Sequence, residues 1–179
     1  MAQVKPEGGR ISGQSSVVQL DAWNWEDAIV KENDGIYVNW PALFRRSGWW
    51  AEPGGIKLNE DYDKEVAELK SFLGEAKAYS TEAKLTKQRN LKMASMVDLF
   101  SGNRKLFVVA DQHKQIIDAI HTCKELGVEM VLVGGRDAWL IPDILVENEI
   151  PVILRHAHNL PGMEAVSYTH LTLPTTPYV

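Results

Sequence analysis

Three short apolar runs recur at nearly even spacing in the second half of the chain, and they constrain the fold more than any other feature. They are residues 105–110 (KLFVVA), 129–133 (EMVLV) and 151–154 (PVIL), and a helical pattern fills each gap between them. Continuous β-rich runs without polar alternation are typical of strands buried on both faces. Helices between such strands indicate βαβ units. We therefore predict an α/β fold with a parallel sheet.

Polar residues follow each of the three runs. A parallel sheet collects the carboxyl ends of its strands at one edge, where the sites of such folds lie. The residues at these ends are Asp111-Gln112-His113, Gly134-Gly135-Arg136-Asp137 and Arg155-His156-Ala157-His158. We expect the site at this edge. The catalytic candidates are Asp111 and His158, and the substrate-binding candidates are Arg136, Asp137, Arg155 and His158.

Several of these side chains have more than one interpretation. His156 and His158 are metal-ligand candidates, because side chains two positions apart on a strand face the same way and can share an ion. Hydrogen bonding or substrate contact is the alternative for this pair. Asp111 could act as a base, orient a ligand or cap the following helix. Gly134-Gly135 could let an anion approach the backbone N–H groups at the start of a helix. The segment matches neither the GxGxxG nor the GxxxxGK(S/T) nucleotide-binding pattern, so we expect a tight turn.

The rest of the chain shows weaker patterns. Apolar residues at helical spacing predict helices over residues 62–79, 91–100, 114–126 and 138–148, and residues 17–20 predict a strand. Five of the six tryptophans lie between residues 21 and 56. We interpret this part as an irregular insertion, a lid or small β-flap. Its tryptophans would form a satellite core under a long loop, or else line a pocket or contact a partner.

The composition excludes several classes of protein. The net charge is −5 and the basic residues are scattered, which argues against a nucleic-acid binder, since such a protein needs a Lys/Arg stripe. No apolar run reaches the roughly 18 residues of a membrane helix. The lone Cys123 rules out an internal disulfide framework, and we expect a small core residue there. A soluble protein is indicated, and the choice between cytoplasm and periplasm stays open.

The two ends of the chain point to an internal piece of a longer protein. Residues 166–179 (VSYTHLTLPTTPYV) look like a translated sequencing adapter, so we treat them as a non-native tail. The expected organisation is a loop and barrel strand over 1–20, the Trp-rich insertion over 21–58, and central (β/α) units over 59–165.

Four segments together resemble a known family. They are GGRISGQSSVVQL, GIYVNWP, the stretch from LFVVADQHK to PVIL, and HNLP. The chain resembles the metal-dependent amidohydrolase superfamily over about residues 7–165, and within it the imidazolonepropionase-like proteins. This resemblance implies a partial (β/α)₈ TIM-type barrel, and a divalent metal, zinc first, that activates water for hydrolysis of C–N bonds in cyclic amides or dipeptide-like small molecules.

The chain departs from the family at two metal-ligand positions. The resemblance places a fifth-strand histidine at Val109 and a sixth-strand histidine at Gly134, and neither side chain can bind a metal. Two hypotheses follow. The full-length protein is a divergent amidohydrolase with Asp111, His113, His156 and His158 near the mouth of the barrel, or it is an inactive barrel that binds a small ligand or a partner, as a homo-oligomer or with an active paralogue. In either case we expect no activity from this fragment.

Overall fold

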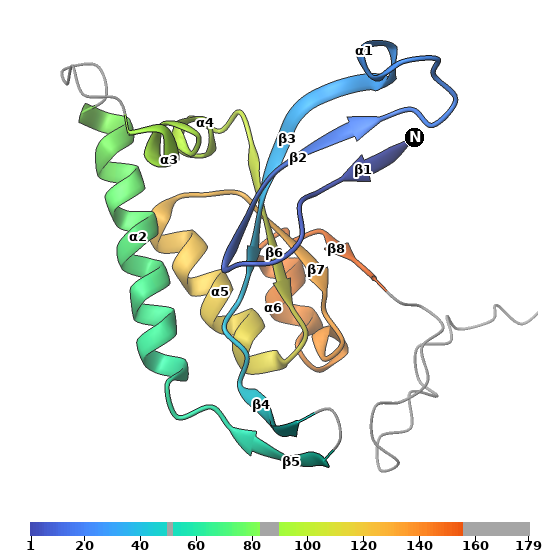
Figure 1. The fold of residues 1–179 in the computed structure, drawn as a ribbon. Coiled ribbons are helices and arrows are strands. Elements are labelled where there is room, and N and C mark those ends of the chain that lie inside the picture. The colour runs from blue at the N-terminus through green and yellow to red at the C-terminus, as the bar shows by residue number, and fades with distance from the viewer. Residues whose placement is uncertain (50–51, 83–89, 156–179) are drawn as a thin grey trace, which may run out of the picture.

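The computed structural model describes residues 1–49, 52–82 and 90–155. In these residues a curled sheet is covered on one face by helices (Figure 1). The strands are β1 (Ala2–Val4), β2 (Ile11–Val18), β3 (Ile29–Asn39), β4 (Phe44–Trp49), β5 (Glu52–Leu58), β6 (Lys105–Ala110), β7 (Met130–Gly134) and β8 (Val152–Ile153). The helices are α1 (Trp25–Ala28), α2 (Tyr62–Glu82), α3 (Leu91–Ala94), α4 (Val97–Phe100), α5 (His113–Leu126), the 3-10 turn η1 (Ala138–Leu140) and α6 (Pro142–Glu147).

The main sheet has six strands in the order β1-β2-β3-β6-β7-β8. Strands β3, β6, β7 and β8 are parallel, which confirms the parallel arrangement predicted for the three apolar runs. In their register Val108 lies between Val38 and Leu132. Strands β1 and β2 are antiparallel to their neighbours, so the alternation of parallel strands and helices does not extend to the start of the chain. The sheet curls like half a barrel (Figure 1).

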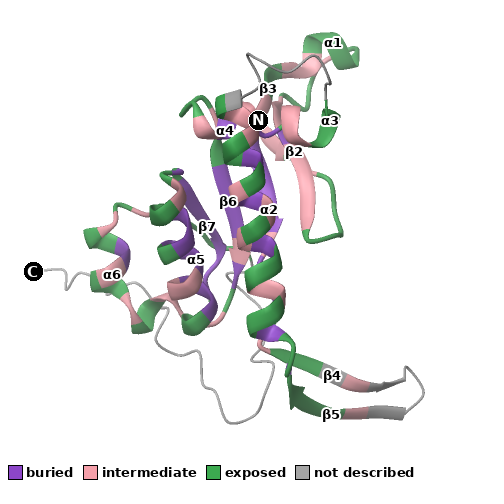
Figure 2. Ribbon diagram, turned by 90° about the vertical axis from the view of Figure 1, so that its left-hand side faces the viewer, coloured by how far each residue is buried: buried purple, intermediate pink, exposed green. Residues whose placement is uncertain are grey.

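The core lies between this sheet and the helices. Ile36, Leu106 and Leu132 are almost fully buried from the sheet side, and Leu73 and Ile116 from the helix side. Figure 2 shows the buried residues running along β6 and β7 and along the inward sides of α2 and α5. These helices bury one stripe each, as their apolar spacing predicts.

The two longest predicted helices are confirmed by α2 and α5. Helix α5 ends at Gly127, whose φ of 69° is the left-handed conformation that glycine adopts at low cost. Cys123 on α5 is buried in the core, as expected, and this burial raises the pKa of its thiol to about 12. Among the described residues, no helix combines the length and apolar character needed to cross a bilayer.

The interpretation of residues 21–58 as an irregular insertion is wrong for residues 29–39. These residues form β3, which pairs with both β2 and β6 near the middle of the sheet. Residues Lys31–Glu32 are exposed and only Gly35–Val38 are buried, so the apolar signal of this strand is short. The antiparallel hairpin of β4 and β5 does match the predicted small β-flap.

The described tryptophans do not form a satellite core. Trp40 is buried in the main core, where its indole N–H donates to the Tyr62 hydroxyl at 3.2 Å. Trp25, the first residue of α1, and Trp23, which precedes the helix, are both exposed. These tryptophans lie at different elements, and only Trp40, which directly follows β3, packs into the core. Nearness in sequence therefore did not bring their side chains together.

Three element boundaries also differ from the sequence prediction. The predicted helix over 138–148 is divided at Ile141, because Pro142 disfavours helical backbone in the residue before it and instead begins α6. The predicted strand 17–20 is β2, which starts at Ile11 and ends at Val18, since strand pairing of its Ser and Gly residues needs no apolar side chains. Residues 91–100 form two short helices, α3 and α4, in place of one.

Candidate functional site

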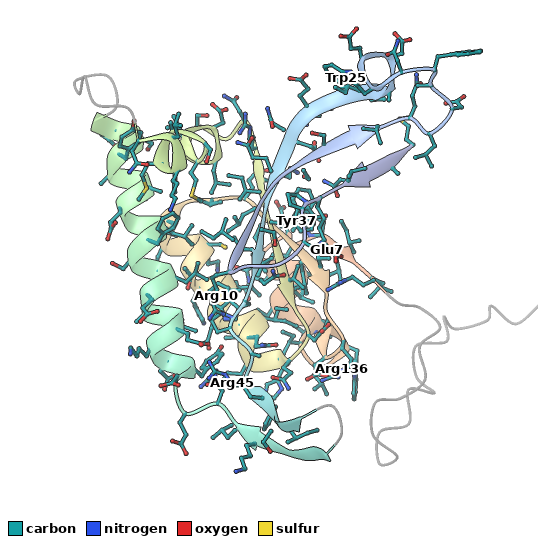
Figure 3. The ribbon with its side chains drawn as sticks, in the orientation of Figure 1. Glu7, Arg10, Trp25, Tyr37, Arg45 and Arg136 are labelled. Carbon is teal, nitrogen blue, oxygen red and sulfur yellow. The ribbon has the colours of Figure 1, made fainter. Side chains whose placement is uncertain are left out.

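The carboxyl ends of four parallel strands lie at one end of the sheet, and we call this end the rim. Because β3, β6, β7 and β8 run in the same direction, the residues that follow them converge there: Trp40 and Pro41, Asp111 to His113, Gly135 to Asp137, and Leu154 and Arg155. Figure 3 shows Arg136 at this end of the molecule, with Trp25 at the opposite end. The described residues that were predicted at the strand ends therefore lie at one edge of the sheet.

Gln115 fixes the turn between β6 and α5. Its carbonyl oxygen accepts from the backbone N–H groups of Asp111 at 3.3 Å and Gln112 at 3.0 Å, and its amide donates to the Pro41 carbonyl at 2.6 Å. The side chain is buried, so these bonds are made away from solvent. Gln115 thus joins the end of β3 to the end of β6 and holds the backbone of Asp111. This bridging role of Gln115 was not predicted from the sequence.

The turn after β7 is tied to the end of β6. Gly135 N–H donates to the Ala110 carbonyl and Asp137 N–H to the Asp111 carbonyl, both at 2.8 Å. Gly134 has a φ of +99°, and a Cβ placed on it would lie 2.6 Å from Oδ1 of Asp111. The Asp111 carboxylate therefore occupies the space in which a side chain at position 134 would stand. The tight turn expected at Gly134-Gly135 is what the structure shows.

Three more predicted residues lie together at this turn. Asp137 Oδ2 is 3.9 Å from His113 Nδ1, and Asp137 Oδ1 is 3.5 Å from Arg136 Nε. Asp137 is the least exposed of the three side chains, at 25% against 58% for His113 and 43% for Arg136. The cation of Arg136 and the ring of His113 are thus available to a ligand, with Asp137 between them.

Arg155 follows β8 and is exposed. Its charge reaches the inner face of the curled sheet, where it acts on Tyr37. Burial raises the pKa of the Tyr37 hydroxyl, Asp34 raises it further, and Arg155 lowers it in part, so the pKa stays above its ordinary value. Tyr37 is therefore a neutral group. His156 and His158 lie outside the described residues.

The inner face itself is small and largely apolar. It consists of Tyr37, Phe107, Val131 and Val133, with Val109 packed against them. The Tyr37 and Phe107 rings are stacked, with centroids 4.8 Å apart. The Tyr37 hydroxyl donates to Oε1 of Gln3 at 2.8 Å, so β1 closes part of this face. Tyr37 and Gln3 were not predicted; the only sequence signal is the alternation in GIYVNW.

The described residues do not by themselves provide a set of ligands for a metal ion. Within residues 1–49, 52–82 and 90–155, no three His, Cys, Asp or Glu side chains are close enough to share one. Val109 faces the inner side without a donor atom, and Gly134 has no side chain. The Asp111 carboxylate lies beside Gly134, one of the two positions where the family resemblance places histidines.

Comparison with known proteins supports the fold. No protein-family profile and no curated protein matches the chain. Among solved structures, the chain is similar to an amidohydrolase from Thermotoga maritima MSB8, with a TM-score of 0.67 and 19% sequence identity over 86% of this chain. The fold is therefore amidohydrolase-like. The chain spans 42% of the length of that structure.

Proposed function

We propose that the full-length protein hydrolyses C–N bonds in cyclic amides or dipeptide-like small molecules, as an amidohydrolase of the imidazolonepropionase-like type. One observation carries the proposal: an acidic, a cationic and an imidazole group converge on the carboxyl rim of an amidohydrolase-like sheet. In barrels of this kind the carboxyl ends of the strands supply the reacting groups.

The residues of this chain have distinct roles in the proposal. Asp111 accepts a proton from the attacking water, because its carboxylate stands at the end of β6 over the small Gly134. Arg136 and Arg155 bind anionic or carbonyl oxygen atoms of the substrate, and Asp137 orients Arg136 and His113. His158 remains a proposed catalytic or substrate-binding residue.

A divalent metal, with zinc as the first choice, would lower the pKa of a bound water when present. Since the described residues do not form a ligand set, His156 and His158 are proposed ligands that further residues of the full-length protein would have to complete.

Two positions favour a second function, a barrel that binds a small ligand without catalysis. Val109 and Gly134 replace the histidines that the family resemblance implies, and the φ of +99° at position 134 disfavours any residue that has a side chain. In this case the same rim would bind a small amide, and the protein would act as a homo-oligomer or beside an active paralogue.

The test uses the full-length protein with and without added zinc, on a panel of cyclic amides and dipeptides. We expect turnover that Asp111→Asn lowers about 10²- to 10⁴-fold, the usual contribution of a general acid or base. Asp21→Asn, an exposed change beside α1, is the matched control and should keep full activity. We expect the 179-residue chain alone to show no turnover.

Two other results would decide against the first proposal. Saturable binding of an amide without turnover under any metal condition would favour the ligand-binding barrel. Turnover that Asp111→Asn leaves unchanged would remove Asp111 from the site.

A further inference from the structure

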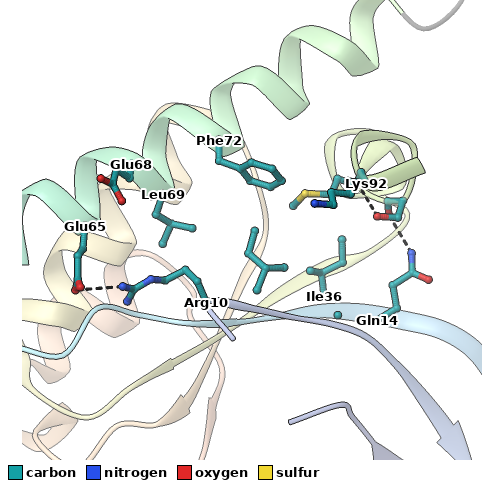
Figure 4. A pocket seen from close by; sticks show the side chains of 12 residues that line it. Arg10, Gln14, Ile36, Glu65, Glu68, Leu69, Phe72 and Lys92 are labelled. Atoms are coloured by element: carbon teal, nitrogen blue, oxygen red, sulfur yellow. Dashed lines mark hydrogen bonds and ion pairs between the residues drawn. The ribbon is translucent and has the colours of Figure 1, made fainter. Parts of the chain in front are cut away.

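A pocket lies on the helix-covered face of the sheet, between α2, α3 and the strands β2 and β3 (Figure 4). Its volume of about 530 Å³ is in the range of small-molecule sites, about 300 to 1,000 Å³. Ile36 lines it, whereas the next residue on the strand, Tyr37, belongs to the opposite, inner face. The pocket therefore lies on the opposite face of the sheet from the inner face, and none of the rim residues named above lines it.

The wall of this pocket is apolar and well packed. Ile36, Leu69 and Met96 are only 2–3% exposed and belong to the main core. Ile11 and Phe72 are partly buried and pack against that core from the two sides of the pocket. Such a wall suits an aromatic ring or a short branched chain, whose burial removes apolar surface from water.

Both ends of the pocket are closed by polar interactions. Arg10 Nη2 lies 3.1 Å from Glu65 Oε2 of α2 at one end, and Gln14 Nε2 donates to the Ser95 carbonyl at 3.0 Å at the other (Figure 4). Arg10 and Gln14 are four residues apart, which spans about 13 Å of extended chain. A helix, about 10 Å wide and continuing beyond both ends, does not fit such a space. A compact molecule does.

The charged groups at the two ends of the pocket differ in their pairing. Figure 4 shows the Lys92 ammonium pointing into the pocket near Phe72 at the Gln14 end. No ion pair among the described residues involves Lys92. At the other end Glu65 is already paired with Arg10 and Arg45, and Glu68 adds a further negative charge. Lys92 is thus a cation without an ion-pair partner in the described part of the chain, whereas Arg10 at the other end is already paired with Glu65.

We propose that this pocket binds a compact amphipathic monocarboxylate, with its aromatic or aliphatic body between Ile11, Leu69 and Phe72 and its carboxylate on Lys92. A second carboxylate on the ligand would find no comparable cation at the other end, because Arg10 there is paired with Glu65 and Glu68 also lines that end. This inference is independent of the proposed hydrolytic function and of the rim.

The experiment titrates the 179-residue chain with 3-phenylpropanoate by calorimetry, and follows the methionine methyl groups by ¹³C NMR. The Met96 methyl lines the pocket and should shift on binding, whereas Met130, which lines a different cavity beside α5, should not. Lys92→Met should weaken binding about two- to fivefold, as expected for an exposed ion pair, and leave the affinity for neutral 3-phenylpropanol unchanged. Lys92 is exposed, so the variant should fold normally, which circular dichroism checks.

Lys124→Met, an equal loss of charge on the exposed side of α5, is the matched control and should bind like the wild type. Phe72→Ala should weaken both the carboxylate and the alcohol. The proposal is overturned by the absence of saturable binding, by a shift of Met130 in place of Met96, by unchanged affinity in Lys92→Met, or by equal weakening in Lys124→Met.

Discussion

At the scale of single residues, Gly35 shows how closely the inner face is packed. A Cβ added to it would lie 2.2 Å from Cε2 of Phe107 and 2.8 Å from the Lys105 carbonyl. The Phe107 ring is stacked on Tyr37 and the carbonyl belongs to β6, so neither contact can move freely. We expect Gly35→Ala to lower the free energy of unfolding by about 1–3 kcal/mol, the usual cost of overpacking.

Urea denaturation measures this change. Gly55→Ala is the matched control, because a Cβ there meets no atom within 4 Å and the glycine has no positive φ. It should change stability by no more than about 0.5 kcal/mol. Equal effects of the two substitutions would show that Gly35 is not sterically constrained.

Glu65 is the residue with the clearest dependence on pH. Burial alone would raise the pKa of its carboxyl, but Arg10, Asn59 and Arg45 outweigh this effect and hold the pKa below its ordinary value. A lowered pKa in the folded state means that the stabilisation is complete above the unfolded value, about 4.3, and is lost as the pH falls through the folded value. Glu65→Gln should therefore destabilise the protein at pH 7. The difference in stability between variant and wild type should shrink as the pH falls toward 3.

The measurement is the urea midpoint of wild type and variant between pH 7 and pH 3. Glu60→Gln serves as the control, since Glu60 is exposed and should show no difference that depends on pH. A constant gap between Glu65→Gln and wild type over the whole pH range would contradict the assignment.

At the scale of elements, α2 has an unused source of stability at Gly74. A Cβ there meets no atom within 4 Å, and the residue lies in the interior of a long helix. Alanine lowers the conformational entropy of the unfolded chain, and it avoids the entropic cost of fixing glycine in a helix. Gly74→Ala should therefore stabilise the protein by about 0.5–1 kcal/mol. The reverse substitution at an exposed position of the same helix, Ala78→Gly, should cost a similar amount. If the midpoint temperature of thermal unfolding shifted in the same direction for both variants, this explanation would be contradicted.

The elements that the sequence predicted well are those whose own residues carry the signal. Strands β6 and β7 are continuous apolar runs because both of their faces are covered. Strand β3 was missed because its first half, around Lys31, is exposed and pairs through its backbone. Strand β2 was predicted only in its apolar last part for the same reason. Backbone pairing of polar strands leaves little pattern to detect in a single sequence.

The position of the candidate site followed from chain direction alone, but its details did not. Parallel strands place Asp111 and Arg136 on one rim wherever the helices lie. The contact of Asp137 with His113, and the space that Asp111 takes above Gly134, depend on how two separate turns fit together. Gln115 is hydrogen-bonded to Pro41, which lies 74 residues away along the chain. Nothing in the local sequence indicates this contact.

At the scale of the whole molecule, the edge at β8 is a surface through which two chains could associate. Among the described residues β8 pairs only with β7, and Val152, Ile153 and Leu154 are 37%, 42% and 57% exposed. A short apolar strand with one free edge is a template for pairing with another chain. We therefore expect the average mass in sedimentation experiments to rise with protein concentration.

The substitution Ile153→Lys should lower this association, because a charge on an edge strand opposes pairing between chains. Leu20→Lys is the control: Leu20 is even more exposed, at 77%, but lies in the loop after β2 and away from the β8 edge. If association came from general apolar exposure, the two variants would reduce it alike. If it comes from the edge, only Ile153→Lys will do so, and a wild-type chain that stays monomeric at all concentrations would show that the edge is already protected.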